Sequence, residues 1–173
     1  MPSADRIFLD YSSHKLHQLE ERIETCLTAL SDRQIWARGG DNENAVGNLV
    51  LHLAGNVRQW IVSGVGGQPD SRQRDGEFAA RGGVPATELL TSLRTTVEEA
   101  AAIIGEVTPE RLVEPLTIQG YEVTVLEAIA HVVEHFSMHT GQIIFATKML
   151  TGADLGFYRH LSGNSHTHDE VTP

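Results

Sequence analysis

The chain has 173 residues, of which 40% are hydrophobic and 21% charged, a composition typical of one soluble globular domain with a sizeable core. Its formal net charge of −10 argues against nucleic-acid backbones and acidic membrane surfaces as partners, because both require basic patches. Cys26 is the single cysteine, which excludes a disulfide framework and a multi-cysteine metal site. The opening segment MPSADRIFLDYSSHK lacks the features of a signal peptide, and no apolar run is long enough to span a membrane, so we expect a cytoplasmic protein.

Two amphipathic helices are predicted in the first third of the chain. The first covers about residues 3–30, where leucines and isoleucines recur at steps of three, four and seven. Cys26 adjoins this apolar stripe and is expected to be a buried, inert thiol. The second helix covers about residues 44–65 and ends in a glycine-rich stretch.

A polar segment, residues 64–84, separates the second helix from the third. It carries one aromatic residue, Phe78, among several arginines. Two interpretations are open: a solvated linker, or an ordered flap that covers a site and is anchored by Phe78. Arg72 and Arg74 are then either solvated or available to bind an anionic substrate.

The second half of the chain predicts two more helices and a hairpin. A third helix begins near Pro85 and continues to about residue 107. Residues 116–123 flank Gln119-Gly120 in a pattern typical of a short hairpin. The fourth helix, to about residue 150, is capped by Thr124 with Glu127 three residues on, and it is apolar nearly all round, which favours a central position.

These elements predict an all-α fold: a four-helix bundle with a short β-hairpin between the third and fourth helices. The bundle is expected to occupy residues 1–160, and a polar tail to occupy residues 161–173.

Four histidines within the predicted helices could form a metal site. His131, His135 and His139 are spaced four apart on one face of the fourth helix, and His52 lies inside the apolar second helix. One ion cannot bind all three histidines of the fourth helix, because His131 and His139 are about 12 Å apart along the helix axis. Geometry therefore leaves two pairs open, His131/His135 and His135/His139, with His52 as the third ligand. The remaining histidines are expected to face solvent or to lie beyond the bundle: His14, His17, His160, His166 and His168.

The same helix also contains an H-x-x-E-H pattern, from His131 to His135, which occurs in zinc peptidases with the glutamate as general base. Glu134 points about 100° away from His135 on a helix, and no downstream acidic ligand is evident. We therefore treat a peptidase as a minor alternative.

Three stretches of the chain resemble the DinB-like superfamily, which includes bacillithiol-transferase type proteins. They are NLVLHLAGNVRQWI, VGGQPDSRQRDGEF and HVVEHFSMHTGQII, and the resemblance covers about residues 36–150. It implies a four-helix bundle, often dimeric, with a divalent metal held by three histidines. The matching positions here are His52, His135 and His139, whereas His131 matches a position one turn outside the triad. The chain departs from the relatives after Trp36, where they carry a proline.

A site of three neutral imidazoles leaves the metal its full charge and open coordination positions, which favours an anionic fourth ligand such as hydroxide, carboxylate or thiolate. Zinc and nickel both suit imidazole. The leading hypothesis is a homodimeric metal-dependent enzyme that acts on a small molecule, namely an S-transferase that uses a low-molecular-weight thiol. The alternatives are a metal-dependent hydrolase, a non-catalytic metal-binding stress protein, and a plain bundle with hydrogen-bonded histidines.

Three amides share helix faces with the histidines, and each either orients an imidazole or forms hydrogen bonds between helices: Asn48, Asn56 and Gln142.

Overall fold

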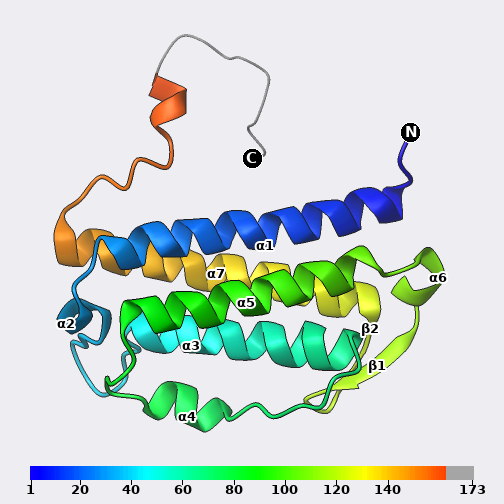
Figure 1. The fold of residues 1–173 in the computed structure, drawn as a ribbon, viewed down its shortest axis with the longest axis horizontal. Helices are drawn as coiled ribbons and strands as arrows, with labels where there is room; N and C mark the ends of the chain where they lie inside the picture. The colour runs from blue at the N-terminus through cyan, green and yellow to red at the C-terminus, as the bar shows by residue number, and fades with distance from the viewer. Residues whose placement is uncertain (163–173) are drawn as a thin grey trace.

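The computed structural model describes residues 1–162 and shows an all-α four-helix bundle with one short hairpin (Figure 1). The long helices are α1 (Ala4–Thr28), α3 (Val46–Val57), α5 (Ala86–Gly105) and α7 (Val125–Thr151). The short elements are α2 (Asp32–Ile35), the π-helix η1 (Arg58–Val65), α4 (Arg74–Ala79), α6 (Pro109–Leu112), β1 (Pro115–Ile118), β2 (Tyr121–Thr124) and the 3₁₀-helix η2 (Arg159–Ser162). Nearly all of the predicted polar tail lies outside the described residues.

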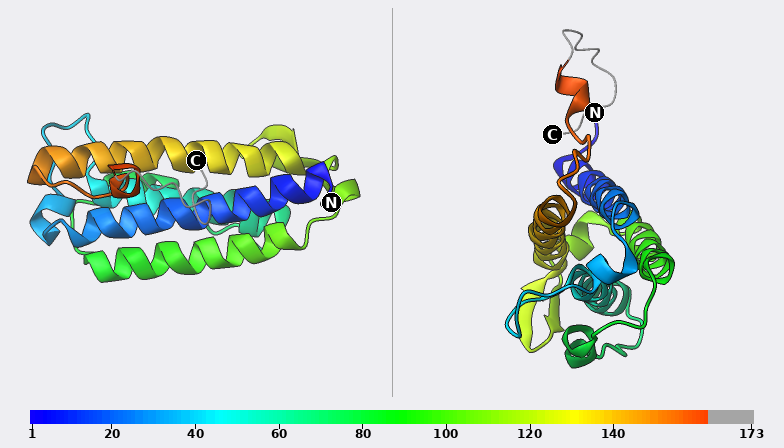
Figure 2. Two further views of the ribbon diagram at one scale, coloured as in Figure 1. Left: turned by 90° about the horizontal axis from the view of Figure 1, so that it is seen from above. Right: turned by 90° about the vertical axis from the view of Figure 1, so that its left-hand side faces the viewer.

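The order of the helices around the bundle determines where the connections run. α1 packs on α5 and α7, and α3 packs on the same two helices from the opposite corner (Figure 2). α3 and α5 run in the same direction, against α1 and α7 (Figure 1). The connection between parallel helices must therefore return along the whole bundle. This connection, residues 66–84, passes along the outside of α3 and carries α4; we call it the flap.

The second helix covers nearly the predicted residues, but its first part is α-helical and its second part is π-helical. α3 is followed directly by η1, in which the N–H of Gly66 donates to the carbonyl of Ile61 five residues back, at 2.7 Å. Both parts contribute to the core, for example Leu53 of α3 and Ile61 of η1, which are fully buried. π-helical turns are rare and frequently mark functional sites.

The hairpin and the start of α7 form as predicted. Gln119 and Gly120 both have positive φ, 54° and 81°, as a two-residue hairpin turn requires. The Thr124 side chain accepts from the Glu127 backbone N–H, and the Glu127 carboxylate accepts from the Thr124 N–H at 2.7 Å. This capping box fixes the first turn of α7, and with it the direction in which the histidines of that helix point.

The prediction that the fourth helix, α7, takes a central position in the bundle is wrong. Its inner face, which includes Ile129 and Phe136, is fully buried, but Phe145 and Met149 are 68% and 72% exposed. α7 occupies a corner of the bundle, so its outer side has no neighbour among the described residues. Despite this apolar surface, neither α7 nor any other described helix is long and apolar enough to cross a membrane.

Candidate metal centre

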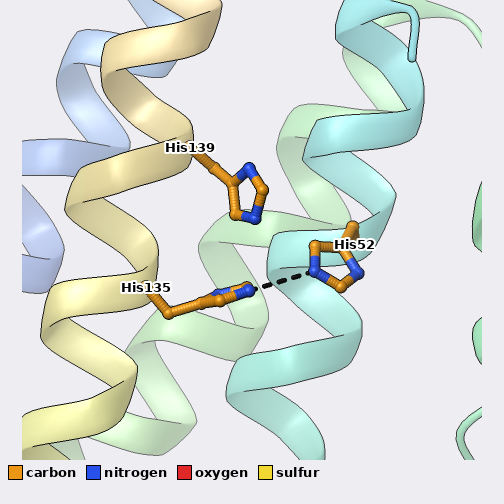
Figure 3. Close-up of side chains that lie close together, drawn as sticks. All are labelled: His52, His135 and His139. Carbon is orange, nitrogen blue, oxygen red and sulfur yellow. Dashed lines mark hydrogen bonds between the residues drawn. The ribbon is translucent and has the colours of Figure 1, made fainter. Parts of the chain in front are cut away.

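Three imidazoles meet in the space between α3 and α7. His52 comes from α3, and His135 and His139 come from successive turns of α7 (Figure 3). One nitrogen from each ring lies within 4.8 Å of the other two, and Nε2 of His52 is 3.1 Å from Nε2 of His135. Two imidazole nitrogens this close either share one proton or direct both lone pairs at one cation. Of the two pairs that geometry left open, the structure brings His135 and His139 together with His52.

His131, the first of the three histidines of α7, lies outside this cluster. Its ring packs on the indole of Trp60, with ring centroids 4.1 Å apart. Burial lowers the pKa of His131, so that it is a neutral, partly buried aromatic side chain one turn below the cluster.

A carboxylate from the flap orients His52. Oε2 of Glu77 lies 3.0 Å from Nδ1 of His52. Burial alone would raise the pKa of Glu77, but hydrogen bonds from Arg72 and His52 outweigh it and hold that pKa below its usual value. Glu77 is therefore ionised and can only accept. Nη2 of Arg72, which can only donate, also lies 3.0 Å from Nδ1 of His52, but it donates to Oε2 of Glu77 at 2.8 Å, so we assign the proton to Nδ1 and the free lone pair to Nε2. Carboxylate–histidine pairs of this kind typically support metal ligands.

An amide orients the second imidazole in the same way. Nδ1 of His139 lies 2.7 Å from Oε1 of Gln142, a carbonyl oxygen that accepts the proton. The lone pair of Nε2 is thereby directed away from Gln142. Among the three amides that share helix faces with the histidines, Gln142 is the one that orients an imidazole.

The cluster favours neutral imidazoles, the form that binds metal. Burial lowers the pKa of His135 to about 3, and the positive charge that His139, His52 and Arg72 would present adds to this effect. Burial also lowers the pKa of His139. Both rings therefore keep lone pairs available near neutral pH.

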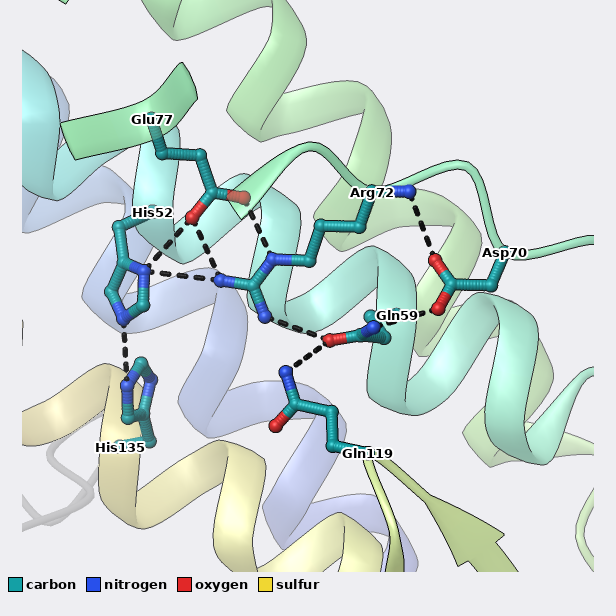
Figure 4. A network of polar contacts seen from close by, with 7 residues as sticks. All are labelled: His52, Gln59, Asp70, Arg72, Glu77, Gln119 and His135. Atoms are coloured by element: carbon teal, nitrogen blue, oxygen red, sulfur yellow. Dashed lines mark hydrogen bonds and ion pairs between the residues drawn. The ribbon is translucent and has the colours of Figure 1, made fainter. Parts of the chain in front are cut away.

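The flap is ordered and carries a buried ion pair beside the cluster (Figure 4). Nε and Nη2 of Arg72 donate to the two oxygens of Glu77 at 2.7 and 2.8 Å, and Nη1 donates to Oε1 of Gln59 at 2.9 Å. Only 3% of the Arg72 side chain and 10% of the Glu77 side chain are exposed. The interpretation of Arg72 as a solvated side chain is therefore wrong, and its guanidinium is committed to Glu77 and Gln59 rather than free for an anionic substrate.

Backbone contacts fasten the flap to α3. Nδ2 of Asn48 donates to the carbonyls of Glu77 and Ala80 at 2.8 and 3.0 Å, and Arg38 donates to the carbonyl of Ala80 at 2.9 Å. The Phe78 ring packs on the His52 ring with centroids 4.7 Å apart. Of the two interpretations of this segment, the ordered flap anchored by Phe78 is correct. Arg38 lies in the stretch directly after Trp36, and this stretch therefore helps to fix the flap.

Gly55 allows the flap to approach α3 closely. A Cβ at this position would overlap Oε1 of Glu77 and lie 3.0 Å from Nε of Arg72.

We predict that Gly55→Ala displaces the ion pair and weakens metal binding, although alanine is favoured over glycine in helices by about 1 kcal/mol. Gly141→Ala on α7 is the control, because nothing lies within 4 Å of its added Cβ. Chemical denaturation and metal titration of both variants test this: equal gains in stability with unchanged metal affinity would contradict it.

A pocket of about 480 Å³ opens beside the cluster and has two of its histidines in the wall. It is bounded by the second helix, the flap, the hairpin and the start of α7. Its lining residues are His52, Asn56, Trp60, Arg72, Arg74, Gln119, Tyr121, Glu122, Val123, Glu127, His131 and His135. A ligand in this pocket would reach the cluster directly.

The other candidate residues lie outside the cluster. Glu134 is exposed, so the peptidase pattern does not assemble a site with a general base. Cys26 is fully buried and burial raises its pKa, as expected of an inert thiol. His14 is exposed, whereas His17 is half-buried rather than facing solvent. The side chain of His160, together with His166 and His168, falls outside what the structure describes.

The contact of Glu77 with the histidine cluster was not predicted from the sequence. Glu77 lies in a polar, acid-containing segment, DGEF, where nothing in the periodicity separates it from Asp75. Its one distinguishing signal is its position beside Phe78, the residue predicted to anchor the flap.

The fold and site define a helical bundle with a three-histidine cluster under a flap. The chain belongs to the family described as proteins of unknown function, DUF1572, whose model matches residues 3–165. One similar solved structure is described as the conserved protein of a locus from Enterococcus faecalis. It has a TM-score of 0.71 and 17% identity, over 83% of this chain and 97% of the other, which supports the fold alone. No protein of curated function matches the chain.

Proposed function

We propose that His52, His135 and His139 hold one divalent metal ion, zinc or nickel. The observation that carries this proposal is the convergence of three ring nitrogens within 4.8 Å, two of them in rings oriented by Glu77 and Gln142. The donor set suits both metals, and the oriented Nδ1–H groups match the support that metal-binding histidines usually have.

We further infer that the site is catalytic rather than purely structural. No fourth histidine, cysteine or carboxylate among residues 1–162 joins the cluster, whereas structural zinc sites are normally closed by four protein ligands. The pocket beside His52 and His135 would give a substrate access to a metal held by the three histidines. The flap limits the access of water from the side of α3.

The reaction we propose is S-transfer from a low-molecular-weight thiol, in line with the resemblance to the DinB-like superfamily. Cys26 is buried away from the cluster, so the sulfur must come from a small molecule. A bound divalent metal would lower the pKa of such a thiol towards neutrality. The thiol would release its proton to solvent, its sulfur would form a bond to an electrophilic carbon, and the leaving group would depart with the electron pair of the bond that joined it to that carbon.

Cobalt substitution tests the proposal. We expect the cobalt(II)-loaded protein to gain a sulfur-to-cobalt charge-transfer absorption on addition of 2-mercaptoethanol, and His135→Ala to show none. Loss of free thiol in the presence of alkyl halides or epoxides should then be faster with wild type than with His135→Ala. If cobalt binds but thiols produce no new absorption, the thiol reaction is wrong, and assays with ester and amide substrates would test the hydrolase alternative.

A further inference from the structure

A half-buried glutamine of η1, Gln59, joins the flap to the hairpin (Figure 4). Its Nε2 donates to Oδ2 of Asp70 at 2.6 Å. Its Oε1 accepts from Nη1 of Arg72 at 2.9 Å and from Nε2 of Gln119 at 2.5 Å. Hydrogen bonds from Gln59 and from the Arg72 backbone lower the pKa of Asp70, so its ionised carboxylate can only accept, whereas a guanidinium can only donate. These partners therefore fix the orientation of the Gln59 amide.

Gln59 belongs to a network of contacts that reaches the histidine cluster. Arg72 uses Nε and Nη2 for the two oxygens of Glu77, so that Nη1 is the nitrogen that faces Gln59. Oε2 of Glu77 in turn lies 3.0 Å from Nδ1 of His52. Attachment to Glu77 on one side and to Gln59 on the other fixes the plane of the guanidinium. Gln59 thereby helps to hold the carboxylate that orients His52.

Gln119 extends the network to the hairpin, in a backbone conformation that glutamine rarely adopts. Its φ is 54°, in the left-handed region, where a two-residue hairpin turn prefers asparagine or glycine. Other residues persist in this region where surrounding contacts hold them, and such positions cluster at functional sites. Gln119 is exposed, and it lines the pocket beside His52 and His135. Its longer side chain is thus less suited to the turn but long enough to reach Gln59.

We propose that Gln59 and Gln119 are positioning residues of the metal centre, which act on His52 through the buried ion pair of the flap. This inference rests on the proposed function, because it requires a metal ion on His52. It extends that function by making the affinity for the ion depend on the contact between the hairpin and η1. Because Gln119 also lines the pocket, the same contact connects the pocket wall to a metal ligand.

Gln119→Asn separates a positioning role from a structural one. Asparagine is favoured over glutamine in a left-handed turn, but its side chain is one methylene shorter and loses the contact with Gln59. We expect the metal affinity to fall about two- to threefold, the low end for one neutral hydrogen bond. The metal-free protein should be at least as stable as wild type. Competition with a chromogenic chelator measures the affinity, and chemical denaturation measures the stability; a purely structural role would change both in the same direction.

Gln59→Leu removes the donor and the acceptor and keeps a side chain of similar size. The metal affinity should fall about three- to tenfold. The visible d–d absorption of the cobalt(II)-loaded protein should also change, because His52 is held less firmly. In this background Gln119→Asn should cause no further loss, since its effect passes through Gln59. Gln68→Leu is the matched control, because Gln68 is exposed and does not line the pocket beside the cluster.

Equal metal affinities of wild type, Gln59→Leu and Gln119→Asn would overturn the positioning role and leave the metal site itself intact. The same loss from Gln119→Asn in both backgrounds, or an equal loss in Gln68→Leu, would also overturn it. If circular dichroism shows that Gln59→Leu does not fold, the opposite changes in affinity and stability expected for Gln119→Asn decide the matter alone. A wild-type protein that binds neither zinc nor cobalt would instead contradict the proposed metal centre.

Discussion

Glu77→Gln should weaken metal binding about 10- to 100-fold, the range typical for loss of a residue that supports a metal ligand. The ionised Glu77 carboxylate accepts the Nδ1 proton of His52 at 3.0 Å and so directs the Nε2 lone pair at the cluster. A glutamine amide is neutral and polarises the imidazole less. It also leaves Arg72 without its ion-pair partner. Competition titration against a chromogenic chelator measures the effect.

Asp75→Asn is the matched control for this variant. Asp75 lies on the same short helix, is exposed, and does not line the pocket. It should bind metal as wild type does. Equal affinities for Glu77→Gln and wild type would show that the carboxylate does not support the site, even if the histidines hold a metal.

Arg72→Ala should open the flap. Removing one partner of a buried ion pair costs about 3–5 kcal/mol, because the remaining charge is left without compensation. Here the flap can relieve that cost by moving away from α3, which returns the Glu77 carboxylate to water. We therefore expect rapid proteolysis within residues 66–84, and a loss of global stability no larger than the cost of detaching this segment. Limited proteolysis measures the opening of the flap, and chemical denaturation measures the loss of global stability.

Arg74→Ala removes a neighbouring exposed charge that forms no ion pair among the described residues and lies 5.0 Å from the centre of the Phe78 ring, so its effect on stability should stay within about 1 kcal/mol. The account of the flap would be wrong if Arg72→Ala and Arg74→Ala were equally resistant to protease.

The sequence predicted the bundle and the histidine cluster well, for identifiable reasons. Long helices can be predicted from their periodicity, as in the second helix, where the positions predicted to face inwards are all buried: Val46, Leu49, Leu53, Val57, Trp60 and Ile61. The capping box at Thr124 and the turn at Gln119-Gly120 are local motifs with local physical causes. Their spacing predicted that His135 and His139 lie on one helix face. The resemblance to the DinB-like superfamily favoured this pair over His131/His135.

The features that the sequence did not predict depend on contacts between distant segments. Glu77 and Arg72 become a buried ion pair only because α3 and α5 are parallel, which forces the flap back along α3. No local pattern distinguishes these residues from solvated ones. Similarly, the apolarity of α7 did not reveal that its corner position leaves Phe145 exposed, because periodicity reports the faces of a helix and not the number of its neighbours.

Elemental analysis of the purified, dialysed protein measures whether the three histidines hold a metal. We expect about one zinc or nickel ion per chain in wild type and in His131→Ala, whose ring lies outside the cluster. His52→Ala, His135→Ala and His139→Ala should each lose most of the metal while keeping the helical circular-dichroism spectrum of wild type. A wild-type protein that stays metal-free after incubation with either ion, or equal metal content in all five proteins, would contradict the proposed metal site.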